Sequence, residues 1–436
     1  MFNGYGDYVR CVVIFCFFLS GCASGQQISN AATSEITSRL TETPETVTTD
    51  ATESASTTPP LNVESRKLKD IVFSPCLAVN AQHPGRTEIP WVILGLRGII
   101  PYAIDPNTGV ISDQLLPNPD PNSNNPIADD FAVSPDGKWL AYDLYGEGNV
   151  SLVVEPSSNI LINSSQGRII WHPSQPTGLE GWLTNESVIL ITYKDPNGFG
   201  STLIRNPFNG EQHEFSLEEM PDSLDYQPGM SGMYLFAHSN LMPDPTLKRV
   251  VYPALIKQNF TVMLWDVENE RIVTSLRLYL DQWFNDPLWS PTGNEFLIMG
   301  INDDEQVEWF QVTRDGAMQE LTYFGEFLGD YKLEKPSRSW DGRYLIFQLS
   351  YNAGKDIKYL ILDLKSEELD GFCIDSVLEE FGPLQSPVWS PDSRYVAITS
   401  GVNTENSGDV ILVDVKSREA FNIGKGVYAI GWLIKP

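Results

Sequence analysis

The stretch Ser134-Pro135-Asp136-Gly137, followed by the apolar run Trp139-Leu140-Ala141-Tyr142, decides the fold because the chain repeats it. Turns of the same kind begin at Ser290, Ser339 and Ser390, and each leads into a run rich in Leu, Ile, Val and Phe. A turn and an apolar strand that return about every fifty residues are typical of blades arranged around an axis. The sequence therefore predicts a β-propeller.

Two weaker copies extend the repeat. Residues 181–187 lead into the apolar run 188–191, and residues 244–247 lead into the run 250–252. With these copies, six units begin near residues 131, 181, 234, 287, 336 and 387. Short β-rich runs separated by Gly, Asn, Asp and Pro predict antiparallel sheets.

The two ends of the repeat region supply what looks like a seventh, divided unit. Residues 427–432 resemble the strand that elsewhere precedes the Ser-Pro turn, and the chain stops at Pro436. Residues 91–94 and 101–105 resemble the strands that should come next. A shared blade would close the ring by hydrogen bonds and protect sheet edges. The predicted fold is all-β: a propeller of seven blades of four antiparallel strands, with the N- and C-terminal strands sharing one blade, preceded by a disordered N-terminal tether.

The repeated phrase resembles that of TolB-like, WD-related propellers of the bacterial envelope. Residues 289–293 and 389–393 match the Trp-Ser-Pro-Asp-Gly phrase best, and the resemblance covers about residues 90–436. The Gly-His pair of true WD repeats is absent, and residues 66–89 are too short for the further N-terminal α/β domain of TolB. The resemblance thus implies the fold, and an envelope role only loosely.

The first 22 residues resemble a bacterial lipoprotein signal peptide. Arg10 precedes an apolar stretch that ends in Leu19-Ser20-Gly21-Cys22. Nine apolar residues are too few to span a bilayer as a helix, which needs about 20. The resemblance implies that residues 1–21 are removed and that Cys22 is lipidated. An ordinary secretory signal with an accidental Cys is the alternative.

Residues 22–65 are predicted to be a tether, and residues 66–436 the propeller. Residues 23–65 contain no aromatic side chain and are dominated by Thr, Ser, Ala and Glu, a composition that cannot bury enough apolar surface to fold. The whole chain has 29 basic and 57 acidic residues and a formal charge of -28. Because phosphate binding requires clustered Lys and Arg, we expect no nucleic-acid partner.

Two cysteines, Cys76 and Cys373, remain after the signal segment and Cys22 are set aside. In an exported chain such a pair is compatible with a disulfide that joins the segment before the first blade to the body. Two separate buried thiols are the alternative.

No sequence motif predicts a particular reaction. The four histidines, at positions 83, 172, 213 and 238, have no metal-ligand spacing, and no Gly-x-Ser-x-Gly elbow occurs. The acidic groups around Asp120, Asp129 and Asp130 and at residues 303–305 lack the order of a dedicated calcium loop. We therefore predict no catalytic residue, metal site or cofactor.

The aromatic residues divide into two sets. Trp139, Trp289, Trp340 and Trp389 lie in or beside the repeated turn, where large rings are expected to pack between blades. Trp283, Phe284, Tyr323 and Phe324 lie off the repeat. We expect the second set to be exposed and to supply contacts for a partner or a glycan.

These observations together predict a lipid-anchored, extracytoplasmic propeller that serves as a protein-binding or scaffold module of the cell envelope. Its expected partners are a membrane, through the lipid, and another envelope protein. The alternatives are an enzyme that acts on polysaccharide or peptide in the central funnel, and a glycan or solute receptor. A funnel lined by convergent charged or His side chains would favour the enzyme, whereas an apolar patch with a polar rim would favour a protein partner.

Overall fold

The computed structural model describes residues 63–80, 89–113, 115, 127–146, 149–162, 164–175, 177–193, 199–216, 219–221, 241–256, 259–277, 287–366, 369–375, 386–400 and 408–436. The chain divides into two units, Met1–Thr58 and Pro59–Pro436, and every described residue belongs to the second. Cys22, Trp283 and Phe284 lie outside the described residues. None of the described helices has the length and apolar character needed to cross a membrane.

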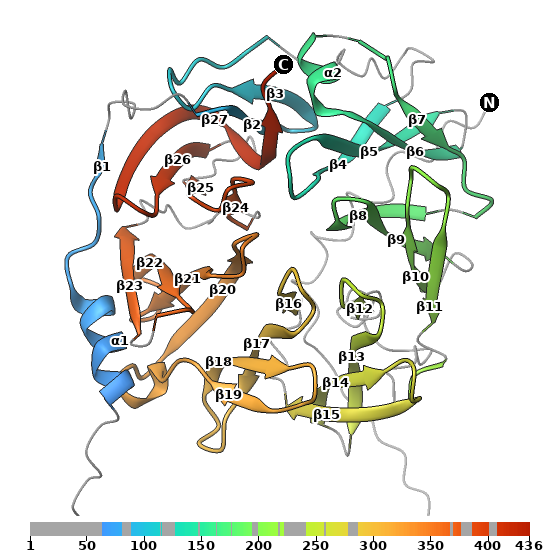
Figure 1. Ribbon diagram of the computed structural model, residues 1–436. Helices are drawn as coiled ribbons and strands as arrows, with labels where there is room; N and C mark the ends of the chain where they lie inside the picture. The colour runs from blue at the N-terminus through green and yellow to red at the C-terminus, as the bar shows by residue number, and fades with distance from the viewer. Residues whose placement is uncertain are drawn as a thin grey trace, which may run out of the picture. The chain divides into compact units, whose positions relative to one another are not determined.

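The second unit is a ring of antiparallel sheets around a central axis, which confirms the predicted β-propeller (Figure 1). In blades 1 to 5 the four strands pair in chain order, starting from the strand nearest the axis. The strands are β4 (Ile127–Val133), β5 (Trp139–Gly146), β6 (Asn149–Pro156) and β7 (Ile169–Trp171) in blade 1; β8 (Thr177–Thr184), β9 (Ser187–Tyr193), β10 (Phe199–Arg205) and β11 (Gln212–Ser216) in blade 2; β12 (Met242–Pro243), β13 (Arg249–Ile256), β14 (Asn259–Asp266) and β15 (Arg271–Arg277) in blade 3; β16 (Leu288–Trp289), β17 (Glu295–Ile301), β18 (Val307–Thr313) and β19 (Met318–Glu320) in blade 4; β20 (Tyr331–Arg338), β21 (Tyr344–Tyr351), β22 (Asp356–Asp363) and β23 (Asp370–Asp375) in blade 5.

Blades 6 and 7 share one long strand, β27 (Glu419–Ile434). Its first part pairs with β26 (Gly408–Asp414) and completes blade 6 after β24 (Val388–Trp389) and β25 (Tyr395–Ser400). Its last part becomes the innermost strand of blade 7 and pairs with β2 (Trp91–Arg97), which pairs with β3 (Ile100–Ile104). An isolated bridge from Ile104 to Ile111 marks the outer edge of this blade. The predicted closure of the ring by both ends of the repeat region is therefore confirmed.

The Ser-Pro-Asp-Gly turn explains why each blade starts with a sharp reversal. In the first copy, Ser134 Oγ donates to Asp136 Oδ1 at 2.8 Å and accepts from the Trp139 backbone N–H at 2.9 Å. The fourth residue adopts the left-handed region: φ is 74° at Gly137 and 58° at Ser393. A Cβ at Gly137 would lie 2.8 Å from the Trp432 carbonyl oxygen, so glycine is required there by space as well. These turns lie on one side of the ring, which we call the turn face.

The core lies between neighbouring blades. Seven clusters of buried side chains correspond to the seven blade interfaces. In β17, Phe296 and Ile298 face blade 3, whereas Leu297 and Met299 face blade 5. Because successive side chains of a strand point to opposite sides, a strand covered on both faces must be apolar throughout. This requirement explains the continuous apolar runs after each turn.

A segment before the first blade covers outer sheet edges. Helix α1 (Val63–Phe73) begins three residues before the expected boundary at residue 66 and buries Leu68 and Val72 against blades 4 and 5. Beyond it, Cys76 is disulfide-bonded to Cys373 of β23, with 4.7 Å between the Cα atoms, so the structure has the bridge rather than two thiols. Strand β1 (Val79–Asn80) then pairs in parallel with β27. These contacts protect the outer edges of blades 5 and 6. Two further short helical segments lie within the described residues: α2 (Ser157–Ile162) and the 3₁₀ turn η5 (Phe324–Glu326).

Candidate functional site: the central mouth

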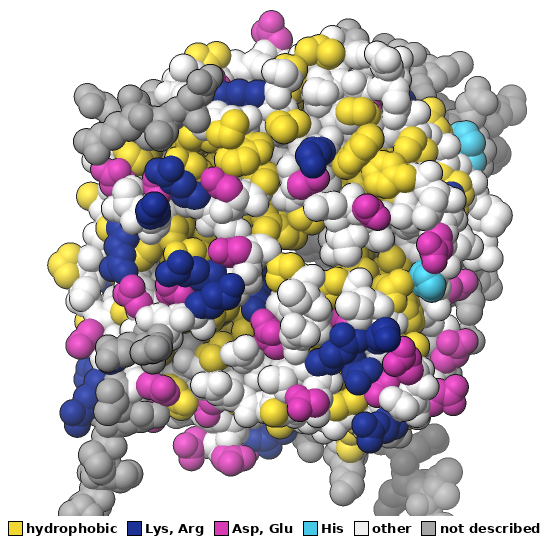
Figure 2. All heavy atoms as spheres, viewed as in Figure 1, with side chains coloured by type: hydrophobic (Ala, Val, Ile, Leu, Met, Phe, Trp, Pro, Cys, Tyr) yellow, Lys and Arg dark blue, Asp and Glu magenta, His cyan; other side chains and the backbone are white. Residues whose placement is uncertain are grey.

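A hollow of about 640 Å³ opens at the axis on the turn face, where the innermost strands meet the four-residue turns. We call it the central mouth. Described residues of all seven blades line it, from Val133 in blade 1 to Trp432 in blade 7. Hydrophobic side chains surround the centre of the ring in the space-filling view (Figure 2). The lining includes eight prolines and five tryptophans, namely Trp182, Trp289, Trp340, Trp389 and Trp432.

Prolines explain how the innermost strands can face a hollow. Pro243 lies within β12, and Pro287, Pro336 and Pro387 precede or enter the innermost strands of blades 4, 5 and 6. Proline has no N–H to offer and is confined to sheet edges. Its presence along the axis removes donors that would otherwise be unpaired at the rim of the mouth. The wall consequently presents apolar ring carbons.

A repeated hydrogen bond joins the innermost strands of neighbouring blades. Trp182, Trp289 and Trp432 lie at equivalent positions, and each indole Nε1–H donates to a backbone carbonyl of the preceding blade. The acceptors are Ala132 at 3.0 Å, Met242 at 3.1 Å and Val388 at 3.0 Å, respectively. We call this contact the indole latch. It fixes the rings in the wall and satisfies their only polar atom.

Blade 5 has Arg338 at the latch position instead of tryptophan. Its Nη1 donates to the Leu288 carbonyl at 3.3 Å, so the guanidinium makes the same inter-blade contact. Its Nη2 lies 2.7 Å from Glu295 Oε1, and the Arg338 side chain is only 6% exposed. Burial lowers the pKa of Arg338, while the hydrogen bond and charge of Glu295 oppose that shift. The sequence alone did not predict a role for Arg338, because no motif marks an arginine at the position that holds a tryptophan in other blades.

Blade 6 departs from the latch in a different way. Trp389 occupies the latch position and is 3% exposed, yet no acceptor among the described residues lies within hydrogen-bonding distance of its Nε1. Its backbone carbonyl instead accepts from Trp340 Nε1 at 3.2 Å. Trp340 is 38% exposed, so its ring forms a ridge at the edge of the mouth. This exposure corrects the expectation that Trp340 would be enclosed between blades.

Charged groups are scarce in this lining. Among the described residues that line the mouth, Asp136 and Arg338 are charged, and each is engaged within the fold. Asp136 Oδ2 lies 3.0 Å from Lys138 Nζ, and Arg338 is paired with Glu295. Burial would raise the pKa of Asp136, but hydrogen bonds from Lys138 and Ser134 outweigh it and lower the pKa. The mouth is therefore suited to apolar contacts and a few hydrogen bonds.

A second hollow on the turn face, also of about 640 Å³, lies between blades 5 and 6, and we call it the charged cleft. Two of its arginines pair with aspartates of their own blade, Arg343 with Asp363 at 2.6 Å and Arg394 with Asp414 at 2.7 Å. Arg418 of blade 6 crosses to Asp370 of blade 5 at 2.7 Å. Basic and acidic side chains lie side by side over these blades (Figure 2). Its charged lining consists of Arg343, Arg394, Lys416 and Arg418 with Asp341, Asp363, Asp370 and Asp392.

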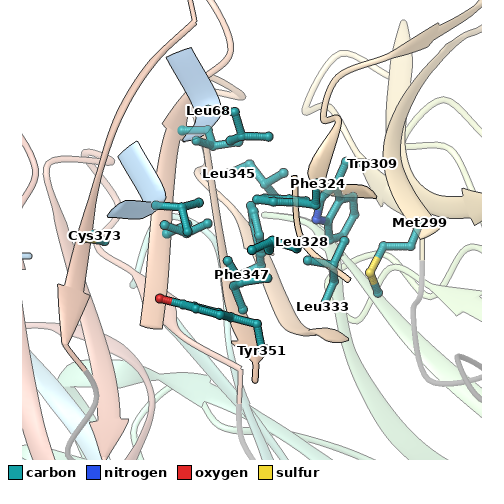
Figure 3. Packing of buried hydrophobic residues seen from close by; sticks show 14 of the residues in the cluster. Leu68, Met299, Trp309, Phe324, Leu328, Leu333, Leu345, Phe347, Tyr351 and Cys373 are labelled. Carbon is teal, nitrogen blue, oxygen red and sulfur yellow. The ribbon is translucent and has the colours of Figure 1, made fainter. Parts of the chain in front are cut away.

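The off-repeat aromatic residues do not form the expected contact surface. Phe324 is fully buried beneath α1, with its ring 6.0 Å from that of Phe347 and 5.8 Å from that of Tyr331 (Figure 3). Tyr323 is half-buried, and its hydroxyl donates to the Glu320 carbonyl at 3.2 Å. The expectation of exposure fails for Phe324 because η5 turns its ring into the interface of blades 4 and 5. For Trp283 and Phe284, which lie outside the described residues, the contact role stays a prediction.

Three of the repeat tryptophans pack largely as expected. Trp389 and Trp289 belong to blade interfaces. Trp139 is half-buried against blade 2, with its ring 4.7 Å from that of Phe208. No group of three or more His, Cys, Asp or Glu side chains within the described ranges is placed to hold a metal ion.

No family model matches the chain, and no curated protein matches it. Among solved structures, TolB from Acinetobacter baumannii is similar over 79% of this chain and 83% of its own, with 12% identity and a TM-score of 0.40. Oligogalacturonate lyase from Vibrio parahaemolyticus is similar over 77% of this chain and 85% of its own, with 10% identity and a TM-score of 0.46.

Proposed function

We propose that this chain is a lipid-anchored, extracytoplasmic β-propeller that serves as a protein-binding module of the cell envelope and receives its partner at the central mouth. The observation that carries the proposal is the lining of the mouth: prolines and tryptophans from seven blades, with both charged side chains engaged within the fold. An apolar hollow with a polar rim is typical of a protein-binding site. Asp136 is the one carboxylate among the described residues of the lining, so the mouth does not meet the criterion given above for the enzyme alternative.

The sequence before the propeller supports the proposed lipid anchor. Residues 19–22 match a lipoprotein box, and the Ser- and Thr-rich residues after them would act as a spacer between lipid and ring. A tether of this kind lets a binding surface search near the membrane at a raised effective concentration. Replacing Cys22→Ser should abolish incorporation of labelled palmitate and move the protein out of the membrane fraction. Unchanged labelling in that variant would refute the anchor.

The protein-binding role is tested with the full chain as bait in detergent-solubilised envelope from the source organism, followed by cross-linking and mass spectrometry. Trp340→Ala removes the exposed ridge of the mouth, and we expect it to lose the cross-linked partner. Phe208→Ala is the matched control, because Phe208 is 39% exposed on blade 2 and does not line the mouth. Equal capture by both variants, or no specific protein with the wild type, would contradict the proposal.

A further inference from the structure

The indole latch leaves one donor of the mouth without an acceptor. Three tryptophans and Arg338 each donate to the carbonyl of a neighbouring blade, whereas Trp389 Nε1 has no acceptor among the described residues. The Trp389 side chain is 3% exposed and lines the mouth. Buried donors are nearly always paired in folded proteins, so the unpaired donor of a residue that lines a candidate site is the place to look for a bond to a ligand.

Five carbonyl oxygens around the mouth already accept side-chain hydrogen bonds. The carbonyl oxygens of Ala132, Met242, Leu288 and Val388 accept the latch bonds, and that of Trp389 accepts from Trp340. These five oxygens are therefore less available to the N–H groups of a ligand. A ligand with few donors, free carbonyls and apolar rings would suit this wall.

The aromatic surroundings of Trp389 point in the same direction. Its ring is stacked on Tyr344 at a centroid distance of 5.9 Å and an interplanar angle of 14°. Trp340 Nε1 donates to the Trp389 carbonyl at 3.2 Å, and Trp340 is 38% exposed. Pro387 and Pro391 complete this part of the lining. Trp340 and Trp389 line the mouth, whereas Tyr344 lines the charged cleft, so the indole of Trp389 belongs to the wall between the two hollows.

We propose that the mouth binds a proline-rich segment of its partner in the polyproline II conformation, and that Trp389 Nε1 donates to a main-chain carbonyl of that segment. This inference rests on the proposed protein-binding function and names the chemistry of the partner. Proline lacks an N–H, and a polyproline II helix makes no internal hydrogen bonds, so its carbonyls are free to accept. Aromatic grooves recognise such segments in other domains at low entropic cost. Because Nε1 exposes less than 1 Å², the bound segment displaces the side chains that cover it.

The test is a titration of the full chain with decaproline, followed by calorimetry and by the indole N–H resonances of ¹⁵N-tryptophan-labelled protein. We expect saturable binding and a downfield shift of one indole resonance that is missing in Trp389→Phe. The substitution keeps an aromatic ring but removes the donor, so it should weaken binding about tenfold, as expected for one hydrogen bond to a buried partner. A Gly-Ser decamer is the control peptide.

Trp309→Phe is the matched control variant. Trp309 Nε1 is also buried without an acceptor among the described residues, but Trp309 lies in the core between blades 4 and 5 (Figure 3). Its removal should leave decaproline binding unchanged. If Trp389→Phe fails to fold, decaproline binding by Trp340→Ala replaces it, and we expect that binding to be weaker because Trp340 is the exposed ring that contacts Trp389.

Three results would overturn the inference: no binding of decaproline, equal binding of the Gly-Ser decamer, or equal losses in the two variants. Its failure is distinguishable from that of the proposed function. If decaproline does not bind but the envelope partner is captured and lost in Trp340→Ala, the mouth binds another kind of segment. If capture fails as well, the protein-binding function itself fails.

Discussion

The central mouth and the charged cleft have the same volume and lie on the same face, yet their linings are opposite in character. The mouth is lined by prolines and tryptophans with two charged residues, whereas the cleft has four basic and four acidic residues. Two turns form the wall between them. Trp340 and Pro391 line the mouth, and the next residues in sequence, Asp341 and Asp392, line the cleft.

The difference shows how one repeated turn can build two surfaces. Asp341 Oδ1 accepts from Ser339 Oγ at 2.6 Å and from the Arg343 backbone N–H at 3.0 Å, so the aspartate is oriented by its own turn. The preceding residue then projects to the other side of the wall. The mouth also depends on all seven blades, whereas the cleft depends on two adjacent ones. The two hollows should therefore respond differently to damage.

Removing residues 427–436 should have the largest effect and should destroy the mouth first. The deletion removes the innermost strand of blade 7, including the pairing of Trp432 with Ile93, the latch to Val388 and the bond from the Ile434 N–H to the Gly137 carbonyl. A ring opened at this point exposes sheet edges and apolar faces, and the loss is comparable to the whole stability of a domain, about 5–15 kcal/mol. We expect aggregation or a broad, non-cooperative melt by calorimetry.

Deletion of Pro436 alone is the control and should melt like the full chain. Hydrogen exchange of the chain without residues 427–436 then compares the mouth with the cleft, because the deletion removes none of the residues that line the cleft. Amides of blades 5 and 6 should remain the better protected part of the truncated chain. A truncated chain that melts as the intact protein does would refute the dependence of the mouth on ring closure.

The architecture of the ring could be predicted from the sequence because its determinants are local and repeated. The turn at Ser134 marks a reversal by its own hydrogen bonds, and a run such as residues 296–299 marks a strand that is buried on both faces. The divided seventh blade followed from the similarity of residues 427–432 to other innermost strands. These signals need no knowledge of distant contacts.

Most of the candidate site could not be predicted from the sequence, because it depends on contacts between neighbouring blades. Trp289 and Trp389 are both followed by Ser-Pro and preceded by an aliphatic residue, yet only the neighbouring blade determines whether the indole finds a carbonyl. Phe324 seemed separate from the repeat, but the packing of α1, some 250 residues earlier in the chain, encloses it. The disulfide at Cys76 could be offered only as one of two alternatives, since pairing requires proximity in space.

Within the mouth, the two tryptophans of blades 4 and 6 should differ in their contribution to stability. Trp289→Phe loses a hydrogen bond and leaves the Met242 carbonyl without this donor, which should cost about 1 kcal/mol beyond the lost packing. Trp389→Phe removes a donor that has no acceptor among the described residues, so relief of its desolvation offsets the lost packing. Urea unfolding should therefore show a free energy of unfolding about 1 kcal/mol lower for Trp289→Phe than for Trp389→Phe. Equal losses would mean that the latch contributes nothing.

The smallest expected effect lies in the charged cleft and concerns acid sensitivity. Burial alone would raise the pKa of Asp363, but hydrogen bonds from Arg343 and the Lys365 N–H, together with the charge of Arg343, outweigh it and lower the pKa. A carboxyl group whose pKa is lower in the folded state contributes stability above its unfolded pKa, about 3.9, and this contribution is lost as the pH falls through the folded value. Asp363→Asn should therefore be less stable than the wild type at pH 7 and approach it as the pH falls below about 4. Because Arg343 is 47% exposed, added salt should reduce the difference at pH 7. Trp289→Phe serves as the reference, since its deficit involves no ionisable group and should persist across the same pH and salt range. If the loss of stability in Asp363→Asn changes with neither pH nor salt, the cleft is stabilised by packing, as the mouth is. The distinction between the two hollows would then be lost.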